Sequence, residues 1–312
     1  MLEIITLGAA AGGGLPQWNC HCDGCKAAWD QPALHHGQVS LAVSADGGAH
    51  WFLINASPDI RAQILHTPAL RPKAGHLRHS PIAGVILTNA EIDAVAGLLS
   101  LREGQKFALH AHPAVLQTLR DNSIFNVLNP DNVPRLPITM GETFEPALPD
   151  GSGSGLEVTA FSLPGKCAWY QEGPSYQAAQ GQAAEEGDTI GLTLRAKGQT
   201  ACVHVVLACA EITPELRERL RGADMVFFEG TLWRDDEMIT QGLSQKTGQR
   251  MGHVSISGAD GTMAQLEGLD IRRKVFVHIN NSNPIWQYDS PERAEATAAG
   301  WEVPQAAEVF KL

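Results

Sequence analysis

The stretch ILTNAEIDAVAG at residues 86–97, which follows the run IAGV at residues 82–85, decides the fold. Its first residues are the end of an apolar run that contains β-branched side chains. A polar turn follows, and a helix is expected to begin at Gly97. This order of features predicts a strand–loop–helix unit. Because α/β enzymes tend to place chemistry on loops at strand ends, the turn supplies candidate site residues. They are Asn89, Glu91 and Asp93.

Length and composition limit the classes of protein that the chain can belong to. Its 312 residues are 44% hydrophobic, so it can bury a large core, and we expect one domain that spans residues 1–312. A net charge of -11 at pH 7 disfavours nucleic acid and anionic membrane surfaces as partners. No run of about 18 apolar residues and no signal-peptide pattern occurs, so a cytoplasmic protein is expected. A homodimer is one oligomeric state that the sequence allows.

Several other apolar runs also end in polar residues. Strands are expected at residues 2–7, 39–43, 50–54, 107–110, 156–163, 190–195, 201–207, 223–228 and 274–277, with helices at 113–120, 213–221 and 291–299. Lys166, Glu229 and His278 each follow one of these strands, and we expect them to share one sheet edge and one site with the turn after residue 88. Residues 171–188 are polar and are predicted to form a lid over that site.

Three cysteines, Cys20, Cys22 and Cys25, lie within six residues of one another. Thiolates at this spacing on a turn can converge on one tetrahedral Zn²⁺, and Gly24 supplies the tight bend. Without an export signal, clustered cysteines favour a metal over disulfides. Three thiolates leave the ion little Lewis acidity, so a structural zinc is predicted, with its fourth ligand from elsewhere in the chain.

The glycine-rich loop at residues 8–14 follows the first expected strand. It fits neither the dinucleotide-binding pattern, which would need a glycine where Gln17 stands, nor the P-loop, because Leu15 and Pro16 follow the last glycine. We therefore expect this loop to bring its backbone close to a site.

The pattern of strand ends resembles the metallo-β-lactamase superfamily, whose motif is His-x-His-x-Asp-His after Leu-Thr. Here Leu-Thr is followed by Asn89, Glu91, Asp93 and Ala94, and the superfamily's Pro-Gly-His turn corresponds to the Pro-Gly pair before Lys166. Its last histidine matches His278. The resemblance implies an α/β (α+β) fold, an αββα sandwich of two mixed β-sheets flanked by helices. It also implies that this chain is not a typical dinuclear hydrolase, because most of the ligands are replaced.

A closer resemblance, nearly end to end, is to the family of coenzyme PQQ (pyrroloquinoline quinone) synthesis proteins B. It rests on the strings GAAAGGGLPQWNCHC at 8–22, NASPDIR at 55–61, GLLSLRE at 97–103, GTLWRDDEM at 230–238, MGH at 251–253 and HINNSNP at 278–284. This resemblance implies a biosynthetic factor that acts on the cross-linked Glu–Tyr-derived precursor of PQQ. The implied activity is iron-dependent hydroxylation of the tyrosine-derived ring. The alternative is a non-catalytic binder or carrier of PQQ or its precursor, with transport toward the periplasm.

One substitution separates this sequence from the family pattern. The family typically keeps Asp-His at the end of the motif, which with the last histidine would give a ligand set suited to Fe(II). Here Ala94 replaces that histidine, so Asp93 and His278 remain as the possible ligands of a second divalent metal such as Fe(II). The choice between a metal-dependent enzyme and a non-catalytic binder therefore depends on Ala94.

The resemblance also suggests roles for residues outside the motif. Glu229 and His253 resemble a pair in ribonuclease Z in which an acid orients a histidine, and we predict them, with Asp93 and His278, as catalytic residues. For an acidic precursor, we expect cations in the pocket and polar groups of the motif turn beside them; these predicted substrate-binding residues are Lys166, Arg61, Arg78, Arg102, Asn89 and Glu91. The position of the fourth zinc ligand in related phosphodiesterases corresponds to Asn281, which is a poor zinc ligand. His278 and a non-protein ligand are therefore alternatives for the fourth ligand.

Overall fold

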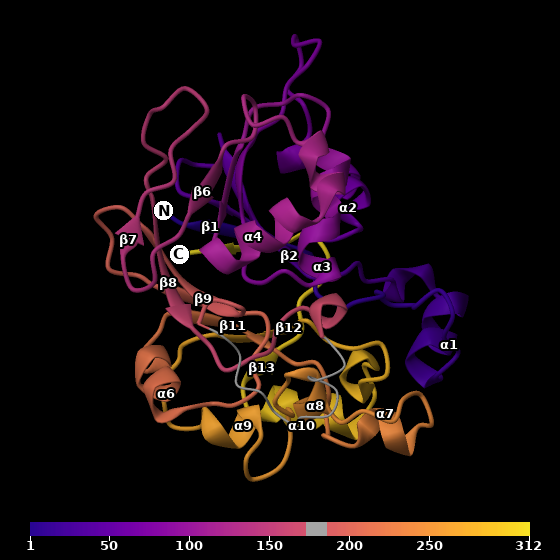
Figure 1. The fold of residues 1–312 in the computed structure, drawn as a ribbon. Helices are drawn as coiled ribbons and strands as arrows, with labels where there is room; N and C mark the ends of the chain where they lie inside the picture. The colour runs from indigo at the N-terminus through magenta and orange to yellow at the C-terminus, as the bar shows by residue number, and fades with distance from the viewer. Residues whose placement is uncertain (173–185) are drawn as a thin grey trace.

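The computed structural model describes residues 1–172 and 186–312 of the chain. Two seven-stranded sheets pack face to face, with helices on the outer face of each (Figure 1). The first half of the chain builds one sheet and its helices, and the second half builds the other, except that the C-terminal strand returns to the first sheet. The two chain ends therefore lie near each other (Figure 1). The predicted αββα sandwich is confirmed.

The first sheet is mixed. Its strands are β1 (Glu3–Gly8), β2 (Ser40–Ser44), β3 (Trp51–Ile54), β4 (Ile82–Ile86), β5 (Ala108–Ala111), β6 (Arg135–Pro137) and β14 (Glu308–Lys311). They lie in the order β14-β1-β2-β3-β4-β5-β6. β14, β1, β2 and β3 pair antiparallel, and the pairs from β3 to β6 are parallel. The strand β4, predicted from the decisive stretch, is thus a buried inner strand whose carboxyl end faces the same way as its neighbours'.

The second sheet is mixed as well. Its strands are β7 (Thr143–Phe144), β8 (Leu156–Ser162), β9 (Ile190–Ala196), β10 (Val203–Val206), β11 (Met225–Glu229), β12 (Lys274–Val277) and β13 (Trp301–Glu302). They lie in the order β13-β12-β11-β10-β9-β8-β7. The pairs from β10 to β13 are parallel and the others are antiparallel. β11 and β12 therefore end at the same edge, which brings Glu229 and the residue after β12, His278, to one place.

Helices cover both outer faces. Their bounds are α1 (Asp23–Asp30), α2 (Ile60–His66), α3 (Ile92–Val95), α4 (Pro113–Asp121), α6 (Pro214–Leu220), α7 (Glu237–Thr240), α8 (Gly248–Met251), α9 (Thr262–Gln265) and α10 (Pro291–Ala298). Apolar residues of α2, α3 and α4 pack on the outer face of the first sheet in one hydrophobic cluster. A larger cluster fills the space between the sheets and continues under α6 and α10. None of the helices in residues 1–172 and 186–312 is long and apolar enough to cross a membrane.

The helix after the decisive turn begins earlier than predicted. α3 starts at Ile92 and lasts one turn, and a 3-10 helix, Ala96–Leu101, continues it, so Gly97 lies inside the helical segment rather than at its start. A Cβ atom on Gly97 would collide with the backbone oxygens of Ala56 and Ser57. Close packing, and not helix initiation, therefore explains the glycine. Asp93 consequently lies in the first helical turn.

The starts of α6 and α2 are stabilised in different ways. Thr213 caps α6, since its hydroxyl accepts the backbone N–H of Leu216. At the start of α2 the N-cap position is Asp59, and no side-chain cap bond forms there. Asn55 exchanges hydrogen bonds with Thr88 just after β4, which ties the ends of two parallel strands together.

Candidate functional site

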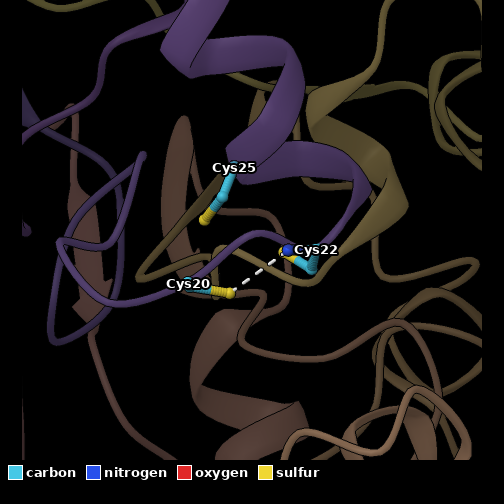
Figure 2. Close-up of side chains that lie close together, drawn as sticks. All are labelled: Cys20, Cys22 and Cys25. Atoms are coloured by element: carbon cyan, nitrogen blue, oxygen red, sulfur yellow. Dashed lines mark hydrogen bonds between the residues drawn. The ribbon is translucent and has the colours of Figure 1, made fainter.

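The three cysteines converge at the start of α1. Cys22 is the N-cap of the helix and Cys25 lies in its first turn, while Cys20 precedes them in the loop (Figure 2). The backbone N–H of Cys22 donates to Sγ of Cys20 at 3.5 Å. The three sulfur atoms lie within 4.8 Å of one another. The spacing of the cysteines in the sequence therefore predicted the cluster correctly.

Asn281 closes this cluster from the segment after β12. Its Nδ2 lies 3.2 Å from Sγ of Cys20, 3.4 Å from Sγ of Cys22 and 3.2 Å from Sγ of Cys25. A tetrahedral zinc with Zn–S near ~2.3 Å and Zn–O near ~2.1 Å would place its fourth ligand about 3.5 Å from each sulfur. The two ends of an amide are interchangeable by rotation, so Oδ1 can take the place of Nδ2. The residues present thus fit zinc, with Asn281 at the fourth position, whereas His278 points to other partners.

When no metal is bound, two of the three thiols of this cluster hold their protons tightly. Burial disfavours the thiolate of the third, Cys20, but hydrogen bonds from Cys22 lower its pKa. Burial raises the pKa of Cys22, and it raises the pKa of Cys25 to about 12. A zinc ion must displace these protons, because the thiolate is the metal ligand. Zinc binding at this cluster is therefore coupled to proton release.

Asp93 and His278 form the centre of the strand-end site. Oδ2 of Asp93 lies 3.0 Å from Nε2 of His278, and the two side chains are 13% and 12% exposed. His278 has a φ of 54°, a left-handed conformation that is uncommon for a residue with a side chain and that turns the chain sharply after β12. The predicted meeting of these two residues is present in the structure, and Asp93 makes no side-chain cap to α3.

The distance between Asp93 and His278 suits either a proton or a metal ion. Two ligands that each lie about 2.1 Å from an ion, at right angles, are about 3.0 Å apart, which is also the length of a hydrogen bond. Burial favours the neutral imidazole, but the hydrogen bond and charge of Asp93 outweigh it and raise the pKa of His278. Burial opposes the charge of Asp93 too, yet the bond from His278 lowers the pKa of that carboxyl. Without a metal, the pair therefore shares a proton.

Glu229, His253 and Thr231 surround the other face of His278. The rings of His253 and His278 stack with centroids 4.9 Å apart. Nδ1 of His253 lies 3.3 Å from Oε2 of the fully buried Glu229 without forming a hydrogen bond. Instead, Glu229 accepts hydrogen bonds from the hydroxyl and the backbone N–H of Thr231 and from the backbone N–H of Val254. Glu229 therefore lies beside His253 without the orienting hydrogen bond that the resemblance implied.

Within the described part of the chain, two sets of potential metal ligands are compact. Besides the cysteines, ligand atoms of Glu229, His253 and His278 lie within 4.8 Å of one another, and Asp93 belongs to neither set. Ala94 is 1% exposed and packs in the hydrophobic cluster on the outer face of the first sheet. Asp93 and His278 thus fit an ion as a pair, with its other positions left open.

Lys166 is engaged by two carboxylates. Its Nζ lies 2.7 Å from Glu91 and 3.5 Å from Glu172, and Glu172 also pairs with Arg250 at 3.0 Å. Asn89 accepts the backbone N–H of Glu91 and is almost fully buried. The predicted substrate contacts Asn89, Glu91 and Lys166 are therefore brought together, but they contact one another.

An open cavity of about 1490 Å³ lies beside this site. Its lining includes His253, Lys166 and two arginines that sequence reasoning missed, Arg234 and Arg250. The predicted pocket cations Arg61, Arg78 and Arg102 are exposed residues elsewhere, and none of them lines this cavity. That expectation is wrong because a sequence match locates a residue in the chain and not its side chain in space.

The glycine-rich loop approaches the site as expected. A Cβ atom on Gly12 would lie 3.5 Å from Oδ2 of Asp93. The loop is held there because Ala11 donates its N–H to the carbonyl of Ile279, next to His278. The predicted lid at residues 171–188 falls mostly outside the described residues.

The fold and the strand-end site define a class of protein. The model of the beta-lactamase superfamily domain matches residues 50–279, so the chain belongs to that superfamily. A diphosphatase of the PhnP family shares the fold at a TM-score of 0.67 and 17% identity, covering 100% of this chain and 98% of that one.

Closer relatives narrow the class to one family. The chain is 59% identical over 304 residues to coenzyme PQQ synthesis protein B of Rhodopseudomonas palustris (strain TIE-1), covering 97% of each protein. It is 54% identical over 305 residues to the protein of that name from Gluconacetobacter diazotrophicus, again covering 97% of each. The Zn²⁺-bound PqqB of Methylobacterium extorquens has a TM-score of 0.92 and 46% identity, covering 99% of this chain and 100% of that one. The chain belongs to the family of coenzyme PQQ synthesis proteins B.

Proposed function

We propose that this protein acts in PQQ synthesis and that it oxidises the tyrosine-derived ring of a PQQ precursor with a divalent metal ion and oxygen. The observation that carries the proposal is the pair formed by Asp93 and His278, 3.0 Å apart beside a histidine that lines an open cavity. A buried chain of carboxylate, imidazole and hydroxyl groups is costly to maintain, so a protein that only bound a ligand would have little use for it. The names of the relatives support the pathway, and the geometry supports the chemistry.

The family implies a metal, and the protein holds two different places for one. Cys20, Cys22, Cys25 and Asn281 would hold a structural zinc, consistent with the Zn²⁺ of the relative from Methylobacterium extorquens. Asp93 and His278 would hold a second ion, and a carboxylate–histidine ligand set with open positions is suited to Fe(II). When bound there, such an ion supplies oxygen chemistry that side chains lack.

Side chains that line the cavity would provide proton transfer and substrate binding. His253 lines the cavity, and its ring stacks on that of His278. In our proposal His253 accepts the proton that the ring of the precursor loses. Lys166, Arg234 and Arg250 line the same cavity, and carboxylates of the acidic precursor would bind them in exchange for their present partners Glu91, Asp236 and Glu172. The partner is thus a small or peptide-derived acid.

A single-turnover assay tests this proposal. The purified protein, supplied with excess Fe(II) in air, should add one oxygen atom of O₂ to a ring-bearing precursor, which mass spectrometry detects. Two electrons from the excess Fe(II) reduce the other oxygen atom to water. Asp93→Ala and His278→Ala should abolish the gain, and Arg61→Ala should leave it intact because Arg61 lies outside the cavity. Absence of any gain with the wild-type protein would contradict the proposal.

A second function, binding or carriage of PQQ or its precursor without chemistry, is favoured by Ala94. With this residue in the hydrophobic cluster, the ion has two protein ligands here. Calorimetry distinguishes the two functions, because a carrier binds PQQ or its precursor without turnover.

The variant Ala94→His tests whether the site of Asp93 and His278 is a metal site that has lost a ligand. It should gain a second tightly bound metal per chain, and Ala94→Leu, a control of comparable size without a ring nitrogen, should not. Thermal unfolding of both variants checks that the buried position accepts the larger side chain. If Ala94→His folds and its metal content does not change, the view of a depleted site is wrong.

A further inference from the structure

The side chain of Thr231 lies between the buried carboxylate of Glu229 and the ring of His278. Its Oγ1 is 2.6 Å from Oε2 of Glu229 and 2.9 Å from Nδ1 of His278. On the far side of the ring, Nε2 is 3.0 Å from Asp93. One continuous row of polar groups therefore runs from Glu229 through Thr231 and His278 to Asp93.

Glu229 acts only as an acceptor in this row. It is fully buried, and each of its oxygens receives a backbone N–H, from Val254 at 2.9 Å on Oε1 and from Thr231 at 3.0 Å on Oε2. Two amide donors fit an ionised carboxylate, and the short contact from the hydroxyl of Thr231 has the length of a charge-assisted hydrogen bond. The hydroxyl proton of Thr231 therefore points to Glu229.

We infer that Thr231 fixes the tautomer of His278, with the proton on Nδ1 and Nε2 directed at Asp93. A threonine hydroxyl has one proton, and here that proton goes to Glu229. Toward Nδ1 of His278 the hydroxyl can only accept, so Nδ1 must carry a hydrogen. The nitrogen left to hold an ion together with Asp93 is Nε2, and in this respect the inference rests on the proposed function.

The opposite arrangement is much less favourable. If Thr231 donated to Nδ1 of His278, its oxygen would face Oε2 of Glu229 at 2.6 Å with no proton between them. Two buried acceptors in contact leave a carboxylate partly unsatisfied, which costs free energy. The backbone of His278, held at a φ of 54°, keeps the ring between its two partners, so the choice of tautomer depends on Thr231.

Thr231 is therefore a positioning residue for the metal ligand. A histidine ligand usually donates its second N–H to a nearby acceptor, which keeps the metal-binding nitrogen free, and loss of that acceptor typically weakens metal binding about 10–100-fold. In this protein the acceptor is the hydroxyl of Thr231, which donates its own proton to the carboxylate of Glu229. The signal in the sequence is the spacing Glu229-Gly-Thr231 at the end of β11, which places both side chains at one strand end.

Nitrogen-15 NMR of the histidine rings tests the inference directly in the wild-type protein. In the metal-free protein, the ring of His278, assigned by comparison with His278→Gln, should carry a proton on Nδ1, while the proton at Nε2 is the one that it shares with Asp93. A ring protonated on Nε2 alone would overturn the inference without any variant of Thr231. The measurement needs no precursor, so it stands apart from the turnover assay: a failed assay with an Nδ1-protonated ring would reject only the proposed function.

A matched pair of variants tests the role of the hydroxyl. Thr231→Ser keeps the hydroxyl and should keep both the tautomer and the affinity of the second site for Co(II). Thr231→Val keeps the shape and should lose the fixed tautomer, with Co(II) binding weakened about tenfold or more. Zinc at the cysteine cluster should stay at the wild-type level in both, which confirms folding. Unchanged tautomer and Co(II) affinity in a folded Thr231→Val variant would overturn the inference.

Discussion

The cysteine cluster and the pair formed by Asp93 and His278 are two sets of potential metal ligands that differ in completeness. In the first, three sulfur atoms gather around the amide of Asn281, which contacts all three of them. In the second, two ligands bond directly to each other, and the position of a third holds Ala94. A site that keeps all of its ligands needs its ion, whereas a site that has lost ligands can replace the ion with a proton.

The largest expected effect follows from damage to the complete site. Cys22→Ser removes one of four ligands, and an equal share of the ~10–16 kcal/mol typical of structural zinc is about 3 kcal/mol, or roughly a hundredfold in affinity. Competition with a chromogenic chelator measures this loss. Cys167→Ser, which removes a thiol outside the cluster, is the control, and equal zinc affinity in the two variants would contradict the assignment of the site.

A smaller effect is expected at the fourth position of the same site. Asn281→Ala should weaken zinc binding less than Cys22→Ser does, because an amide is a weaker ligand than a thiolate. Asn281→Asp should tighten it, because a carboxylate oxygen adds charge at the same place. The order of chelator competition among the three proteins sharpens the comparison, and tighter binding by the alanine variant would show that Asn281 is no ligand.

The smallest expected change in free energy concerns the proton shared by the incomplete site. The pKa of His278 is raised in the folded protein, so its stabilising effect is fully present below the ordinary value of 6.5 and is lost as the pH rises through the raised value. The pKa of Asp93 is lowered, so its effect is lost only as the pH falls through that lowered value, below the ordinary 3.8. The pair therefore stabilises the protein in the window between these two pKa values.

Asp93→Asn removes the partner that raises the pKa of His278. Burial then dominates, and the pKa of His278 should fall below its ordinary value, which an NMR titration of the ring detects. In urea unfolding, the advantage of the wild-type protein over the variant should shrink as the pH rises from neutral. If His278 titrates identically in both proteins, the shared proton is not the reason for its shift.

Local signals in the sequence predicted the fold and the first site well. Strand β4, the polar turn after it and the cysteines near α1 are each set by residues that are close in the chain, where spacing and periodicity carry the information. The late strand-end histidine, His278, could be placed because β11 and β12 are parallel neighbours that end at one edge. The prediction of these elements required no knowledge of the direction of their side chains.

Features that depend on side-chain direction could not be predicted in the same way. Asn281 seemed a poor zinc ligand, yet the turn after His278 aims its amide at three sulfur atoms from the other end of the chain. Arg102 matched a family string but donates to the carbonyl of Leu99 on the surface. Thr231 was not recognised because a hydroxyl gains its role only from the two groups that it connects.

Metal content per chain tests the central claim most directly. After dialysis against a mild chelator, the wild-type protein should hold about one zinc, and Asp93→Ala with His278→Ala should leave that amount unchanged. Cys20→Ser combined with Cys25→Ser should remove it. Two tightly bound metals in the wild-type protein, or one metal that disappears with Asp93 and His278 but survives loss of the cysteines, would contradict the account.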